Sequence, residues 1–88
     1  NFAEAWNKRA TVYFMMGDFD KSMQDIIKTL ELEPRHFGAL DGMGLIFIHQ
    51  GQYQQAIDVY DKMLEIFPFS LKTMEKRENI MSFISQST

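Results

Sequence analysis

Apolar residues recur along the chain at the spacing of one helix face, and the pattern returns after 34 residues. Trp6, Ala10 and Tyr13 stand at i, i+4 and i+7, positions that share one side of an α-helix. Leu40 and Phe47 occupy the first and last of these places 34 positions later. A fixed period of this length is typical of a solenoid built from pairs of helices.

Glycine and proline mark where the helices end. Gly17 and Gly51 interrupt the two units at matching places, and Pro34 and Pro68 close them. We therefore expect an all-α chain, an α–α superhelix of five antiparallel helices at about residues 3–16, 19–32, 37–50, 53–66 and 71–85. Asp18 should cap the second helix.

The same alignment divides the chain into a first unit (3–36), a second unit (37–70) and a closing helix (71–86). We expect this closing helix to cover the fourth helix through Met74, Met81 and Ile84, with Ile80 as a further candidate and Ser70 as its N-cap. On the second helix Ile27 is expected to be buried. Gly44, inside the third helix, should mark the close approach of a neighbouring helix.

These residues resemble the tetratricopeptide repeat family, whose unit is a 34-residue helix–turn–helix with a W-x₂-L-G-x₂-Y…A-x₃-F…A…P pattern. The resemblance covers two full units and the closing helix. It rests on residues 6, 10, 13, 22 and 34 of the first unit and on residues 40, 43, 44, 47, 56, 60 and 68 of the second. Arg9, Thr29 and Met63 depart from the pattern, which suggests looser packing or an added neighbour around Arg9 and Met63.

The resemblance implies a scaffold whose first helices line a concave groove for a peptide or a partner helix. The groove positions carried over by alignment are Asn7, Thr11, Phe14, Met15, Asp41, Leu45, Ile48, His49, Lys72, Glu75 and Asn79. One subgroup of the family grips the C-terminal carboxylate of a chaperone with a lysine and two asparagines. Asn7, Thr11 and Gly42 stand at those places, so we do not expect that ligand.

Composition gives little support to chemistry of other kinds. The formal charge of −3 is mild and mixed in sign, so the chain lacks the basic footprint of a nucleic-acid binder, and no apolar run could span a bilayer. There is no cysteine, and His36 and His49 are too few for a zinc site. We expect no catalytic residues, no metal and no cofactor.

Two functions stay open. The first is a non-enzymatic scaffold that holds a partner protein or peptide, with Leu45 and Ile48 as an apolar strip and Asp41 as an acceptor beside it. The alternative is structural self-association, as a homodimer or against further repeats, through aromatic residues such as Phe2 and Phe69. Because the chain begins at a repeat boundary, we interpret it as a piece of a longer array, with any targeting signal upstream.

Overall fold

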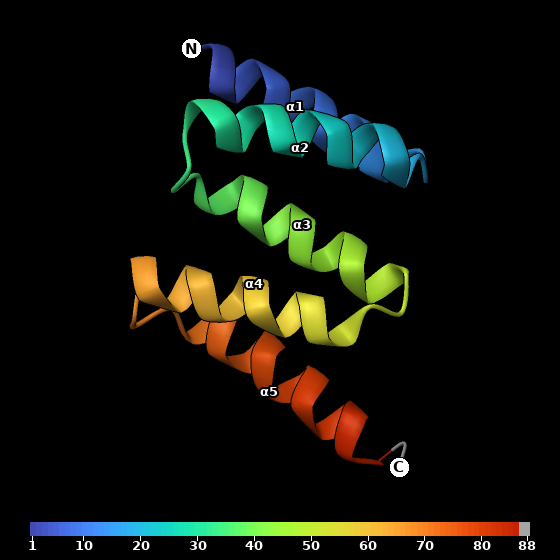
Figure 1. Cartoon of the computed structure of the whole chain (residues 1–88), viewed down its shortest axis with the longest axis vertical. Helices are drawn as coiled ribbons and strands as arrows, with labels where there is room; N and C mark the ends of the chain where they lie inside the picture. The colour runs from blue at the N-terminus through green and yellow to red at the C-terminus, as the bar shows by residue number, and fades with distance from the viewer. Residues whose placement is uncertain (87–88) are drawn as a thin grey trace.

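The computed structural model describes residues 1–86, which form five helices that follow one another along a 41 Å axis (Figure 1). The expected all-α solenoid is confirmed. The helices are α1 (Phe2–Met15), α2 (Phe19–Leu32), α3 (Phe37–His49), α4 (Tyr53–Ile66) and α5 (Leu71–Gln86). Each helix packs against the next, and α1 also contacts α3, so the first helices of the two units lie together on one side.

Local signals in the sequence set the helix ends. Gly17 and Gly51 adopt φ angles of 78° and 74°, a region that glycine enters without steric cost. Asp18 caps α2, its carboxylate accepting from the N–H of Lys21 at 3.2 Å. Ser70 caps α5 in the same way, and both expected caps are confirmed. The helix boundaries agree with the expected ones to within one residue.

Two apolar clusters form the core. The first joins the two units and consists of Ala10, Ile26, Ala39 and Ile46. The second lies among α3, α4 and α5 and consists of Leu40, Ala56, Ile57, Val59, Tyr60, Met63 and Ile80. Burying one such isoleucine, leucine or methionine stabilises the fold by about 1.5–3 kcal/mol. Met63 is fully buried, so packing around this departure from the family pattern is tight, not loose.

Gly44 lies directly against the ring of Tyr60, and the expected close approach at this glycine is confirmed. A Cβ atom added to Gly44 would stand 2.8 Å from Tyr60 Cε1 and 2.9 Å from its Cζ. The ring itself is fully buried. Because α4 packs this closely against α3, a larger residue at position 44 would clash with the ring.

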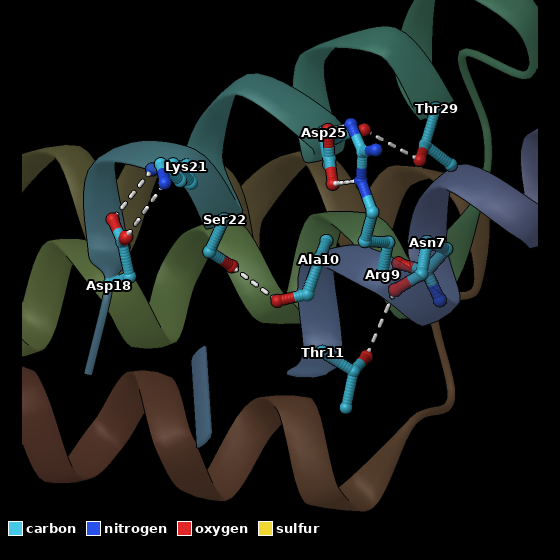
Figure 2. A network of polar contacts seen from close by, with 9 residues as sticks. All are labelled: Asn7, Arg9, Ala10, Thr11, Asp18, Lys21, Ser22, Asp25 and Thr29. Carbon is cyan, nitrogen blue, oxygen red and sulfur yellow. Dashed lines mark hydrogen bonds and ion pairs between the residues drawn. The ribbon is translucent and has the colours of Figure 1, made fainter. Parts of the chain in front are cut away.

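Arg9 has gained a charged partner where the family has an apolar contact. Its guanidinium donates to both carboxylate oxygens of Asp25, at 2.7 and 3.0 Å (Figure 2). The guanidinium also lies over the ring of Trp6, 5.0 Å from its centroid. The contact with Asp25 raises the pKa of Arg9, chiefly through the hydrogen bond. The Asp25 side chain is only 4% exposed, so the arginine compensates a carboxylate inside the first unit.

Three expected core residues are exposed, which corrects the predicted faces of two helices. Ile27 is 47% exposed because it lies on a side of α2 that neither α1 nor α3 covers. Met74 and Met81 are also exposed, whereas Ile80, the further candidate, is buried together with Thr73. Met74 matches Leu40, which packs into the cluster with α4, whereas among residues 1–86 α5 has no second helix over it.

Candidate functional site

A hollow of about 220 Å³ opens between the two units, where α1 and α3 lie beside each other and α2 forms the base. Its lining comes from three helices, and we call it the inter-unit pocket. The lining residues are Asn7, Ala10, Thr11, Phe14, Ser22, Ile26, Gly38, Asp41, Gly42 and Leu45.

Two glycines on α3 leave room for the pocket. A Cβ on Gly42 would stand 3.3 Å from Ile26 Cδ1, and one on Gly38 would stand 3.3 Å from His36 Cε1 and 3.5 Å from Asn7 Nδ2. The two glycines are four residues apart and so share one face of the helix. Longer side chains on this face would fill the space between α3 and α1.

Two hydroxyl groups of the pocket lining are hydrogen-bonded within the chain. The Ser22 hydroxyl donates to the carbonyl of Ala10 at 2.7 Å, and the Thr11 hydroxyl donates to the carbonyl of Asn7 at 3.1 Å (Figure 2). Ile26 is buried, while Phe14 and Leu45 are half-buried. The floor therefore presents apolar surface, and a polar ligand gains little from it.

The rim near α1 is fixed by His36. Its Nδ1 accepts from the N–H of Ala39 at 3.0 Å, which caps α3, and its Nε2 bonds to the Glu4 carboxylate. This hydrogen bond lowers the pKa of Glu4. His36 thereby ties the start of α3 to α1 beside Gly38, and its role is structural.

Asp41 is the only residue of the pocket lining that carries a formal charge. Lys76 of α5 donates to its carboxylate at 2.7 Å. Both side chains are about one-third exposed. Burial raises the pKa of Tyr60 to about 12, and the negative charge of Asp41 is the second, smaller cause.

Five of the eleven groove positions predicted from the sequence line this pocket, namely residues 7, 11, 14, 41 and 45. The other six do not. Ile48 packs against the second core cluster, and Met15 is 79% exposed. His49 packs against the rings of Phe14 and Phe19, with centroids 5.5 and 5.1 Å away.

The remaining three predicted positions are on α5. Glu75 and Asn79 line a separate shallow hollow with Leu71, Met74 and Glu78, and Lys72 lines neither hollow.

Sequence reasoning missed the residues that shape the pocket and the lysine that reaches it. Ala10, Ile26 and Gly38 were not among the predicted groove positions, and Gly42 was considered only as a position where the carboxylate clamp is not matched. The unmatched pair Gly38 and Gly42 was the available signal, because the first unit has Glu4 and Lys8 at these places. Lys76 gave no such signal, since it is 35 residues from Asp41.

Neither a group of metal ligands nor a membrane-spanning helix is found in the described part of the chain. Across residues 1–86 no three histidine or carboxylate side chains come together as metal ligands would. No helix in that range combines the length and the apolar content needed to cross a bilayer.

Comparison with known proteins places both units in one family. Models of the tetratricopeptide repeat match residues 3–36 and 37–70. A TPR repeat-containing protein of Rhizobium etli is 42% identical over 82 residues, which are 93% of this chain and 40% of that protein. Sperm-associated antigen 1 of Mus musculus is 32% identical over 66 residues, 75% of this chain and 7% of that protein. The chain thus spans less than half of either relative.

A solved structure shares the fold. The first TPR of Spaghetti (RPAP3), bound to the HSP90 peptide SRMEEVD, superposes with a TM-score of 0.86 at 18% identity. The match covers 96% of this chain and 68% of that one.

Proposed function

Because the chain belongs to the tetratricopeptide repeat family, we propose that it is a protein-interaction module with no catalysis of its own, and that it holds an apolar side chain of a partner segment in the inter-unit pocket. The partner segment is an extended peptide or one face of a helix, as in other grooves of this kind. The rest of the segment lies along α1 and α3.

The observation that carries the proposal is the apolar pocket itself. Its volume of about 220 Å³ exceeds the ~150 Å³ of a cavity that accepts benzene. One leucine, methionine or phenylalanine side chain therefore fits. Phe14, Ile26 and Leu45 supply the apolar contacts, and desolvating such an anchor drives the association.

The ligand proposed here differs from the peptide held by the structural neighbour. That peptide, SRMEEVD, is acidic. In this chain Asn7, Thr11 and Gly42 stand where the family's carboxylate-binding members carry their clamp, and the pocket lining contains no lysine or arginine. An acidic chain end would meet Asp41 and no cation within the pocket.

Replacing Leu45 with aspartate tests the proposal. We expect Leu45→Asp to abolish capture of partner proteins from an extract of the native source, because it places a second carboxylate in the apolar pocket one turn from Asp41. Since Leu45 is only half-buried, the melting temperature should change little. Bound proteins are identified by mass spectrometry and folding is followed by circular dichroism.

Val12→Asp is the matched control. Val12 is 53% exposed on α1 and does not line the pocket, so this variant should retain the wild-type partners. Equal capture by the wild type and Leu45→Asp would refute the pocket's role. Unfolding of Leu45→Asp would show that the residue belongs to the core.

Self-association is the second candidate. Phe2, Phe69 and Leu71 are each at least 75% exposed, and exposed apolar surface of this kind marks contact sites when it is contiguous. Sedimentation velocity over a range of concentrations separates the two functions. A monomer at all concentrations argues against self-association, whereas a dimer that Phe69→Ser dissolves supports it.

A further inference from the structure

The ion pair between Asp41 and Lys76 lies at the edge of the inter-unit pocket and connects two helices whose backbones make no contact in the described part of the chain. The backbones of α3 and α5 make no contact within residues 1–86, because α4 lies between them (Figure 1). Lys76 spans this gap with its side chain and donates to Asp41 at 2.7 Å. The pair thus joins the side chains of two helices that are separated by α4.

The pair is accessible and can be exchanged. The side chains of Lys76 and Asp41 are 35% and 31% exposed, which places them between the core and bulk solvent. Pairs at such positions contribute little to stability, since water competes for both ions. A second cation that approaches Asp41 from the pocket can therefore displace Lys76 at small cost.

The charges around the pocket set which partner gains from this exchange. Asp41 lies one turn before Leu45, so a group bound to its carboxylate is adjacent to the apolar anchor site. On the opposite wall, Asn7 and Thr11 are neutral. Behind Asp41 is the buried ring of Tyr60, whose raised pKa reflects burial and the nearby carboxylate. Asp41 therefore lines the pocket and also lies close enough to the buried Tyr60 to affect its pKa.

We propose that the partner segment carries a lysine or arginine beside its apolar anchor, and that this cation replaces Lys76 on Asp41 when the segment binds. Lys76 is then a built-in competitor that weakens binding of basic segments and holds Asp41 neutralised in the free protein. This inference rests on the proposed pocket function, and it specifies the charge of the partner.

Three synthetic peptides provide the test. Each is acetylated and amidated and has one central leucine, flanked on both sides by lysine, glutamate or serine. Binding to the isotope-labelled 88-residue chain is measured at low salt from the amide shifts of Gly42 and Leu45. We expect the lysine peptide to bind more tightly than the serine peptide, and the glutamate peptide to bind most weakly.

Variants of the pair sharpen the test. Lys76→Gln should raise affinity for the lysine peptide about two- to five-fold, the range that one exposed ion pair supports, and leave the serine peptide unchanged. The swap Asp41→Lys with Lys76→Asp keeps an ion pair but should reverse the preference toward glutamate. Lys72→Gln is the control, because it removes an exposed positive charge one turn away on α5 and should alter neither affinity.

The outcomes separate this inference from the function on which it rests. If no peptide shifts the pocket amides, the proposed pocket function fails. If all three bind with equal affinity, the pocket holds its anchor but the role of Asp41 is refuted. If the glutamate peptide binds best to the wild type, Lys76 is the recognition charge and the inference is overturned.

Discussion

Alanine substitution at two glycines of α3 should have opposite effects on stability. Gly42 and Gly44 are two residues apart in the same helix, so replacing either with alanine gains the same ~0.8–1 kcal/mol of helix propensity. What differs is the space around the new methyl group. At Gly44 it would stand 2.8 Å from Cε1 of the fully buried Tyr60, while at Gly42 it would stand 3.3 Å from Cδ1 of Ile26.

The expected magnitudes follow from these contacts. The fully buried ring of Tyr60 has little room to move aside, and overpacking of this kind costs about 1–3 kcal/mol. After the gain in helix propensity is subtracted, Gly44→Ala should destabilise the fold by up to about 2 kcal/mol. The Ile26 contact involves the far end of a flexible side chain, so Gly42→Ala should stabilise the fold by about 0.5 kcal/mol. The two variants should therefore differ by about 0.5–2.5 kcal/mol, which at ~4–8 °C per kcal/mol separates their melting temperatures by at least about 2 °C.

Urea denaturation followed by far-ultraviolet circular dichroism measures both variants, with an unchanged m-value as evidence that the two-state comparison holds. A free energy of unfolding that rises equally in the two variants would contradict the close packing of α3 and α4. The double variant Gly44→Ala with Tyr60→Ala provides an internal check. Without the ring, adding alanine at position 44 should no longer cost stability.

Two further predictions concern the closing helix and the buried tyrosine. Ile80→Ala should lower the free energy of unfolding by about 2–4 kcal/mol in urea denaturation, because Ile80 is only 9% exposed. Met81 is 43% exposed, so Met81→Ala should cost under about 1 kcal/mol. Equal losses would mean that α5 presents a different face to α4. Burial and Asp41 raise the pKa of Tyr60 to about 12, above its ordinary value near 10. The unfolded chain therefore loses this proton first, so stability should fall as the pH rises from about 10 to 12, by on the order of 2–3 kcal/mol. Tyr60→Phe should remove that part of the alkaline loss, and a tyrosinate absorbance titration in which all three tyrosines ionise together would disprove the shift.

The fold was predictable because its signals are local and repeated. The 3.6-residue pattern, the glycines at the turns and the two closing prolines fixed five helices to within one residue. Even the contact at Gly44 followed from its match with Ala10. The alignment failed at α5, where Met74 was expected to be buried in the same way as Leu40. No second helix packs over α5 within residues 1–86, so α5 buries only the face that contacts α4.

Pairs that differ between the two units were visible in the sequence but hard to interpret. Arg9 and Asp25 in the first unit correspond to Met43 and Val59 in the second, so an ion pair replaces an apolar pair. Comparing the units residue by residue would have indicated that contact. The link from Lys76 to Asp41 could not be found in this way, because it depends on how far α5 leans across α4.

Part of the pocket was predictable for the same reason. Leu45 and Asp41 were placed in the groove by alignment with the family pattern, and their spacing of four residues puts them on one face of the helix. Ile48 was misplaced toward the groove because spacing cannot show that α4 already covers it. The depth of the pocket depends on the lack of a side chain at Gly38 and Gly42, and a pattern of hydrophobic positions does not indicate such a space.

Glu78 has a consequence for any attempt to lengthen this solenoid by design. In the first two units the matching residues are Ala10 and Gly44, and these small residues let the second helix approach, with Ser22 and Tyr60 against them. Glu78 places a carboxylate there, on a side chain that is 76% exposed. A copy of α4 appended after α5 would meet that carboxylate where its tyrosine ring must lie. An engineered third unit therefore needs a small residue at position 78 before any other change can help.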